Sequence, residues 1–300
     1  MSRPKSYTKF SAWFFSAVAI ITILLGLVML LVDSLPVWRH GGVGFISGTR
    51  WFFRQDEFGA GAMIYGSVVV ALVAILIAAP LGVCAAVFGV EFLPQKWRLA
   101  LKVVIELLAG VPSVVYGLLG VLLLRNWIYD LFSKFDISSG DTLLTAGILL
   151  GVMILPTVMT LSDDALRSVP KNQRTAARGL GMNSSEAALF VSIPQATPGF
   201  LAAILLGLGR AVGETIAVFL VVGRQDNQFP TSFFSLEPLL SSGQTLSSKL
   251  GGAETNIAYG QPLHWGAITG LGLLLLCVVI LITLLGIWLR TLSMKQYETA

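Results

Sequence analysis

Residues 200–222 read FLAAILLGLGRAVGETIAVFLVV, an apolar run interrupted only by the charges of Arg210 and Glu214. A helix of about 20 mainly apolar residues crosses the hydrocarbon core of a bilayer, so this stretch predicts a membrane-spanning helix. Arg210 falls near its middle. Because charged side chains at that depth are rare and usually face other helices or water, we expect this helix to belong to a bundle with a pathway inside it.

The rest of the chain is equally apolar. Of its 300 residues, 55% are hydrophobic and 12% are charged, whereas a soluble domain carries about 25% charged residues. Too few polar residues are present to cover a globule that faces water. The same composition excludes a disordered chain and a nucleic-acid-binding arm, and two cysteines inside apolar stretches do not imply a disulfide framework.

Six stretches are long and apolar enough to cross a bilayer: residues 13–32, 63–90, 103–124, 142–161, 200–222 and 266–289. They must be helices, because unpaired backbone groups are too costly in hydrocarbon and no strand-like alternation predicts a barrel. The first could be a cleavable signal peptide, but its apolar run is too long and no clear A-x-A site follows, which favours a retained span. The expected fold is an all-α integral membrane protein.

Lysine and arginine are unevenly shared between the two sides of this six-span layout. The two termini and the loops around Lys96 and Arg174 hold twelve of them, and the opposite loops hold seven. Cytoplasmic loops carry the excess of such residues, so the bias predicts that both termini are cytoplasmic. An even number of spans agrees with this.

The long connection after the fourth span, residues 162–199, contains two short helical patterns. The first begins at Pro170, a residue suited to the start of a helix, and runs through Ala176 and Ala177. Gly181 follows, where a left-handed turn would end the helix. The sequence therefore predicts a helix, a glycine turn and a second helix beside the membrane.

Asn183 and Glu186 have the spacing of a capping box that opens the second helix, and Pro194 and Pro198 should break it before the fifth span. Two interpretations of the pair remain open on this pattern. The helices could lie on lipid headgroups, or they could form a rigid knob for another protein.

The spacing of this loop resembles a family signature. Thr175-Ala176-Ala177, three residues, Gly181, nine residues and Val191-Ser192-Ile193-Pro194 is similar to the EAA-xxx-G-x9-I-x-L-P signature of ABC importer permeases, with Thr175 at the position of Glu and Val191 and Ile193 at the positions of Ile and Leu. The resemblance implies a type I ABC importer permease whose loop forms a coupling helix in a cleft of the ATPase. The coupling residues would be Thr175, Ala176, Ala177, Gly181, Asn183, Glu186 and Pro194.

No G-x-x-x-x-G-K-[ST] segment occurs in the sequence, so this chain has no phosphate-cradling loop for ATP. If transport is driven by ATP, the nucleotide binds to a separate ATPase chain, and we expect no cofactor here. The resemblance divides the chain into an N-terminal helix and outer loop (1–61), a permease core with its coupling loop (62–290) and a cytoplasmic tail (291–300).

Two interpretations of Arg210 were weighed. Glu214 lies four residues further along a continuous helix, on the same face, so the two could form a structural pair that fixes a helix contact. A purely structural contact could be made by Ser or Thr, whereas the planar guanidinium suits phosphate oxygens. We therefore favour a pathway role, in which Glu214 holds the guanidinium and moderates its charge.

The third span contains a second irregularity, at Pro112. This residue lacks a backbone N–H and should kink or break the helix, so that Ser113 could face a pathway, as in the broken helices of transporters. An ordinary proline kink is the alternative for Ser113. Glu106, near the cytoplasmic end, could pair with Lys102.

The segments LLAGVPSVVYGLLG (107–120) and LGLGRAVGETIAV (206–218) make the chain resemble the phosphate-specific branch of ABC permeases, the PstC type. The resemblance implies a multi-pass protein of the bacterial inner membrane and a substrate pathway with Arg210, Glu214 and Ser113. It also implies a paralogous permease, two ATPase subunits and a periplasmic phosphate-binding protein as partners.

Other functions are less consistent with the residues. A hydrolytic or zinc enzyme needs histidines, and His40 and His264 lie outside or at the edge of the spans without a ligand partner at useful spacing. We interpret both as loop or interface residues and the chain as a transport subunit rather than an enzyme. The remaining alternatives are an ABC permease for another anion and a secondary anion transporter, which would not need the coupling loop.

Overall fold

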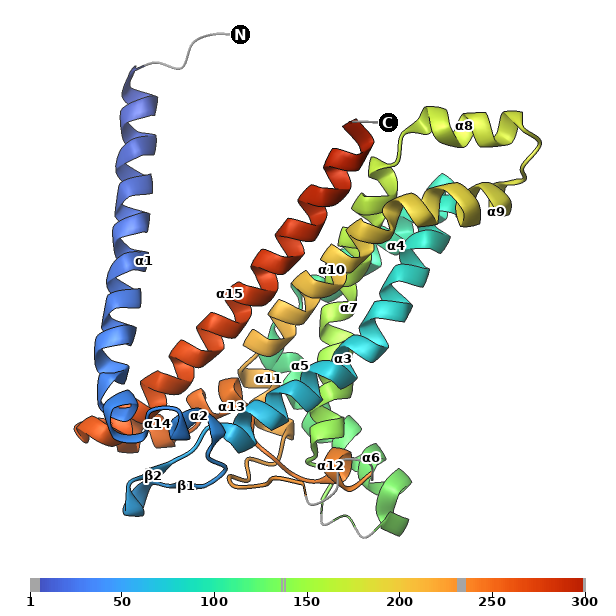
Figure 1. Ribbon diagram of the computed structural model, residues 1–300. Coiled ribbons are helices and arrows are strands. Elements are labelled where there is room, and N and C mark those ends of the chain that lie inside the picture. The colour runs from blue at the N-terminus through green and yellow to red at the C-terminus, as the bar shows by residue number, and fades with distance from the viewer. Residues whose placement is uncertain (1–5, 136, 138, 231–235, 299–300) are drawn as a thin grey trace.

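The computed structural model describes residues 6–135, 137, 139–230 and 236–298. Its long helices are α1 (Ser6–Gly41), α3 (Gly61–Val87), α4 (Gln95–Gly110), α7 (Leu143–Ser168), α10 (Ile193–Gly213) and α15 (Pro262–Glu298) (Figure 1). The shorter ones are α2 (Gly44–Ser47), α5 (Ser113–Leu119), α6 (Arg125–Phe132), α8 (Lys171–Gly179), α9 (Ser184–Ala187), α11 (Ile216–Val221), α12 (Glu237–Leu240), α13 (Leu246–Leu250) and α14 (Glu254–Ala258). Strands β1 (Trp51–Phe52) and β2 (Glu57–Phe58) form a small antiparallel hairpin.

Six helices of the described chain are long and apolar enough to cross a membrane, which confirms the predicted number. Their bounds are Ser11–Gly41, Gly61–Phe92, Ser113–Phe135, Leu143–Ser168, Ser184–Gly213 and Pro262–Leu289. Most of these helices extend beyond the predicted apolar runs, because they continue into the more polar residues on either side. The third span shifts toward the C-terminus, because the preceding helix α4 is a separate segment.

The centre of the bundle is built from α3, α7 and α10 (Figure 1). Glycines allow the close approach of α3 and α7: a Cβ added to Gly147 would lie 2.5 Å from Val73 Cβ, and one on Gly82 would lie 3.0 Å from Val158 Cγ1. Small residues are common at membrane helix contacts because packing has to replace the hydrophobic effect there. The result is a rigid pair of helices against which α10 rests.

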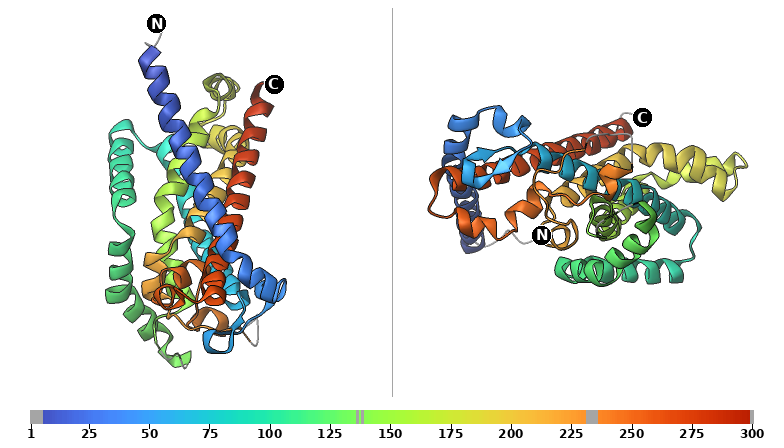
Figure 2. Two further views of the ribbon diagram at one scale, coloured as in Figure 1. Left: turned by 90° about the vertical axis from the view of Figure 1, so that its left-hand side faces the viewer. Right: turned by 90° about the horizontal axis from the view of Figure 1, so that it is seen from below.

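Helix α1 lies at the edge of the molecule and reaches away from the others, as Figure 2 also shows from two further directions. It packs on α15, and none of the residues in its most apolar window is buried. Its surface is therefore available to lipid or to another helix.

Two helices are interrupted within the bundle. The break between α4 and α5 falls at Val111 and Pro112, where the backbone becomes extended, so the predicted effect of Pro112 is confirmed. The break between α10 and α11 falls at Glu214, which has an extended ψ of 124°. The prediction of one continuous helix over 200–222 is therefore wrong.

The helix that precedes α10 has no break where one was predicted. α9, the π-helical turn η5 (Ala188–Ser192) and α10 form one continuous span, with Pro194 in the first turn of α10 and Pro198 inside it. The expectation that these prolines end the helix is wrong. The π turn η5 changes the hydrogen-bond register just before Pro194. This proline, which has no backbone N–H, is therefore accommodated without ending the helix.

The loops gather at two opposite ends of the bundle (Figures 1 and 2). One end carries α8 and α9, together with the first turns of α1 and the last turns of α15; we call it the coupling end. The other carries α2, the β1–β2 hairpin, α12, α13 and α14, and we call it the outer end. Both ends of the described chain therefore lie on the side of α8 and α9.

Candidate functional site

Arg210 lies in the last turn of α10, and its side chain is exposed on the surface of this chain. Its guanidinium Nη1 donates a hydrogen bond of 2.8 Å to Thr157 Oγ1 of α7. Within the part of the chain that the structure describes, no carboxylate forms an ion pair with it. The guanidinium is thus held at one point and has donors that remain free for a ligand.

Thr157 is placed by the tight packing of its neighbour. Val158 is fully buried, and its side chain fills the space beside Gly207 of α10 and Gly82 of α3. This contact fixes the rotation of α7, so that Thr157 faces Arg210. Helices α7 and α10 therefore meet at Arg210.

Glu214 does not pair with Arg210 in this structure. The sequence predicts that the two residues lie one turn apart on the same helix face. This is wrong, because α10 ends at Gly213, before Glu214. The Glu214 carboxylate lies 3.5 Å from the backbone N–H of Ala217, which donates to it in the first turn of α11. Its backbone carbonyl accepts a hydrogen bond of 2.7 Å from Ser247 Oγ of α13.

Ser113 is half-buried at the first position of α5, directly after the break at Pro112. Tyr116 O–H donates to the carbonyl of Leu108 across this break, at 2.9 Å. The bond satisfies a carbonyl at the end of α4 that has lost its helical partner. It holds the two half-helices together.

At the coupling end, the predicted helix caps are confirmed. Gly181 has a φ of +90°, its N–H bonds to the carbonyl of Arg178, and the N–H of Met182 bonds to the carbonyl of Ala177. This pair of bonds is a Schellman motif, which a glycine in the left-handed region closes. Pro170 precedes α8 as its N-cap residue rather than its first helical residue.

The capping box is also present. Asn183 Oδ1 accepts from the N–H of Glu186 at 2.9 Å, and Glu186 Oε2 accepts from the N–H of Asn183 at 2.8 Å. Of the signature residues, Thr175 and Ala176 are exposed and Ala177 is buried, while Pro194 lies in the first turn of α10. The pair α8–α9 with its turn (Lys171–Ala187) is therefore a preformed projection, which we call the knob.

Two features of this knob were not anticipated. Leu180 is 82% exposed at the turn between the helices, an apolar group at the tip of a polar loop. Arg174 forms an ion pair at 3.0 Å with Glu91, which lies in the π-helical turn η2 (Phe88–Phe92) directly after α3, and donates to the carbonyl of Leu166 at the end of α7. These two contacts connect α8 to the segment after α3 and to the end of α7.

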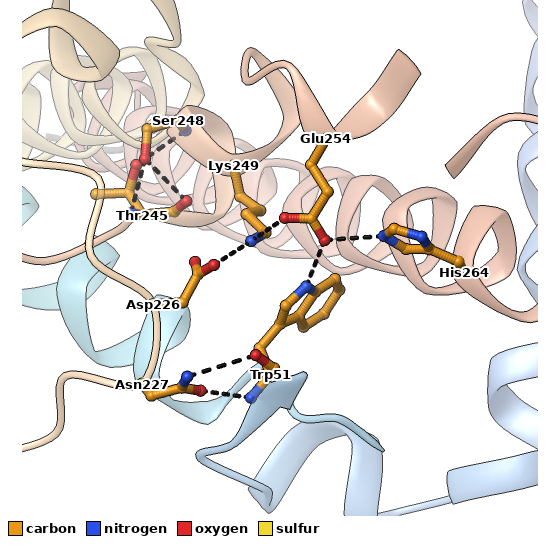
Figure 3. A network of polar contacts seen from close by, with 8 residues as sticks. All are labelled: Trp51, Asp226, Asn227, Thr245, Ser248, Lys249, Glu254 and His264. Atoms are coloured by element: carbon orange, nitrogen blue, oxygen red, sulfur yellow. Dashed lines mark hydrogen bonds and ion pairs between the residues drawn. The ribbon is translucent and has the colours of Figure 1, made fainter. Parts of the chain in front are cut away.

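The outer end contains a buried charge network that the sequence did not reveal (Figure 3). Lys249 of α13 is 2% exposed and pairs with Asp226 at 2.6 Å and with Glu254 at 2.5 Å. Trp51 Nε1 donates to Glu254 Oε1 at 2.6 Å, and His264 Nε2 lies 2.8 Å from the same oxygen. The network joins both outer loops to the start of α15.

Of the two histidines interpreted as loop or interface residues, His264 belongs to a helix and not to a loop. It lies in the first turn of α15, 1% exposed, with its ring stacked between Phe53 and Phe58. His40 lies in the last turn of α1. Ion partners distant in sequence, such as Lys249 and Asp226, have no local spacing signal by which they could have been found.

The pKa values of the two carboxyl groups in the network are shifted in opposite directions. Burial raises the pKa of Asp226, and the charge and hydrogen bond of Lys249 offset this only in part. Burial also acts to raise the pKa of Glu254, but the hydrogen bonds from Lys249, Trp51 and His264, together with the Lys249 charge, outweigh it and leave the pKa below its usual value. The surroundings thus favour the ionised form of the Glu254 carboxyl and the neutral form of the Asp226 carboxyl, each relative to its ordinary pKa.

Glu254→Gln should lower the unfolding midpoint of the purified protein by roughly 5 °C at pH 7, since it removes one partner of a buried ion pair. A carboxyl whose folded pKa is lowered contributes stability above its unfolded pKa and loses it as the pH falls through the folded pKa. The difference from the wild type should therefore shrink below pH 4.5, the ordinary pKa of this group.

Asp226→Asn is the matched control for this pH series. Its folded pKa is raised, so the stability linked to its titration is lost as the pH rises, and its difference from the wild type should follow the opposite trend. Thermal unfolding followed by fluorescence between roughly pH 2.5 and pH 8 measures both variants, because the loss expected for Glu254 lies below its ordinary pKa of 4.5. A pH-independent effect of Glu254→Gln would contradict the ionised state assigned to Glu254.

Six membrane spans, an exposed arginine beside a helix break and a capped helix pair at one end are together typical of a membrane transport subunit. The family model of the binding-protein-dependent transport system inner membrane component matches residues 78–297. The chain therefore belongs to the family of binding-protein-dependent ABC importer permeases, transport components rather than enzymes.

Its relatives indicate a branch of this family. It is 32% identical over 285 residues to the phosphate transport system permease protein PstC of Mesorhizobium japonicum, covering 89% of this chain and 84% of that protein. It is 32% identical to PstC 2 of Mycobacterium tuberculosis (88% and 84% covered) and 36% identical to the probable ABC transporter permease protein YqgH of Bacillus subtilis (81% and 78%). Over most of its length the chain is thus similar to permeases of the PstC type, and its six apolar helices agree with a multi-pass protein of the inner membrane.

Solved structures show the same fold. A chain of a bacterial transporter for the acidic polysaccharide alginate aligns with a TM-score of 0.57 at 12% identity, over 96% of this chain and 98% of that one. A chain of the MetNI methionine ABC transporter aligns with a TM-score of 0.54 at 17% identity, over 78% and 94%. The type I importer permease architecture is confirmed.

Proposed function

We propose that this chain and a paralogous permease together form the path of an ATP-driven phosphate importer. The termini and the α8–α9 knob face the cytoplasm, and the outer end faces the periplasm, where a phosphate-binding protein delivers its ligand. Two copies of a separate ATPase subunit bind the knobs. The relatives named for phosphate transport and the lysine and arginine bias of the loops support this assignment.

One observation carries the proposal: Arg210 is exposed in the last turn of α10, beside the helix break at Glu214, with no carboxylate bound to it among the described residues. A guanidinium in that position needs a counterion, and phosphate oxygens match its planar set of donors. Ser113 and Glu214, each at a helix break, complete the proposed pathway. Glu214 would act there without a direct bond to Arg210.

Radiolabelled phosphate uptake into proteoliposomes of the whole complex tests this function. Uptake should require ATP inside the proteoliposomes and the phosphate-binding protein outside them. An excess of sulfate should not compete with phosphate for uptake. Uptake without ATP would indicate a secondary transporter. Uptake of sulfate in preference to phosphate would indicate a permease for another anion.

Thr157→Val should reduce the initial rate of phosphate uptake about fivefold, because it removes the one hydrogen bond that orients Arg210. Thr157→Ser keeps the hydroxyl and should retain most of the rate. Thr160→Val is a matched control, since its hydroxyl donates only to the carbonyl of Pro156 in the same helix. Equal rates in the two valine variants would contradict a role for Thr157.

A further inference from the structure

Helix α13 belongs to an outer loop but is packed inside the bundle. Leu246, Ser247, Ser248 and Lys249 are each at most 2% exposed. Loops ordinarily run over the surface, where water satisfies their backbone groups. Burial of a five-residue helix at the outer end therefore indicates a packed element of the bundle.

The burial is possible because the polar groups of α13 find partners on other helices. The N–H of Leu246 donates to Ser67 Oγ of α3 at 2.9 Å, and Thr245 and Ser248 form a capping box at the start of the helix. Lys249 is held by Asp226 and Glu254, one on each side of it (Figure 3). A buried lysine with two carboxylate partners is costly to displace.

One contact connects α13 to the proposed pathway. Ser247 Oγ donates to the carbonyl of Glu214 at 2.7 Å, at the residue where α10 ends. A carbonyl at an interrupted helix end lacks its usual partner, and Ser247 supplies it. A cavity of about 10 Å³, lined in part by Thr245, Ser247, Ala211 and Val212, lies between α13 and the last turn of α10, close to Arg210 in sequence.

We propose that Ser247 is a positioning residue for transport, and that α13, anchored through Lys249, closes the outer side of the pathway by holding the end of α10 in place. The inference rests on the pathway role proposed for Arg210. Displacement of α13 would break the hydrogen bond to the carbonyl of Glu214 and widen the small cavity between α13 and α10. Access from the outer end to the last turn of α10 would then increase.

The experiment measures this access directly. Val212→Cys is introduced into the whole complex after replacement of the exposed Cys84 and Cys277 by serine. The thiol at position 212 is then labelled from the outer side with a membrane-impermeant maleimide, with and without Ser247→Ala. We expect labelling to be about fivefold faster with Ser247→Ala, the factor by which one ordinary hydrogen bond shifts an equilibrium.

Ser242→Ala is the matched control. Ser242 lies in the same loop, and its hydroxyl also donates to a backbone carbonyl, that of Asp141, but it does not touch the end of α10. Its labelling rate should equal that of the parent. Equal rates in Ser247→Ala and Ser242→Ala would overturn the proposal, because the bond to Glu214 would then have no special effect.

Phosphate transport is scored separately from labelling. In proteoliposomes loaded with radiolabelled phosphate, Ser247→Ala should also raise the rate at which phosphate leaks out in the absence of ATP about fivefold. If labelling responds to Ser247→Ala but the parent complex carries no phosphate, the proposed function fails and the closure by α13 stands. If phosphate is carried and labelling does not respond, the closure by α13 fails and the proposed function stands.

Discussion

Arg210→Ala should abolish phosphate uptake, with a loss of about 100-fold or more, while the complex still assembles. Two charge-assisted hydrogen bonds to phosphate contribute enough free energy for a loss of that size. Assembly should survive because the side chain is exposed and its one described hydrogen bond in this chain is to Thr157. Radiolabelled uptake by proteoliposomes and co-purification of the partner chains measure the two effects.

Arg210→Lys separates charge from geometry in the same assay. Lysine keeps the positive charge but lacks the planar set of donors, so we expect uptake between that of the wild type and that of the alanine variant. Near-normal uptake by Arg210→Ala would remove the basis of the proposed pathway. Loss of the assembled complex would assign Arg210 a structural role instead.

Leu180→Asp should remove ATP-driven uptake almost completely and prevent capture of the ATPase by the permease. Leu180 is 82% exposed at the tip of a turn whose backbone is fixed by Gly181, so it can enter an apolar pocket without rearrangement of the knob. A carboxylate buried there would be unpaired, which is strongly unfavourable. Co-purification and ATP-dependent uptake provide the measurement.

The choice of Leu180 follows from the burial of its neighbours. Ala177, which does belong to the family signature, is 5% exposed, so an aspartate there would damage the loop itself and would not test docking. Val43→Asp is the control: Val43 is 79% exposed, but at the outer end. ATPase capture that persists in Leu180→Asp would show that the knob docks elsewhere or not at all.

Much of this architecture is readable from the sequence, because the bilayer imposes simple requirements. Six apolar runs predicted six spans, and local chemistry predicted the turn at Gly181 and the capping box of Asn183 and Glu186. These features depend on residues a few positions apart. The break at Pro112 was predicted for the same reason, since proline acts on its own helix.

Features that depend on contacts between distant segments leave no local pattern in the sequence. The end of α10 at Glu214 is stabilised by Ser247 from another loop, so the apolar run 200–222 seemed continuous. Thr157 has no sequence signal as the partner of Arg210, because the two residues meet only where α7 packs against α10. The Lys249 network likewise joins residues from three separate parts of the chain.

The interruption of α10 also explains how a lone cation is tolerated in the bundle. A helix that stops inside the protein presents its carbonyl end there, and this end carries a partial negative charge. Arg210 lies in the last turn of α10, within reach of that field. Backbone dipoles thus balance part of the positive charge without occupying the guanidinium, as a bound carboxylate would. An uninterrupted α-helix would offer no such compensation at mid-depth.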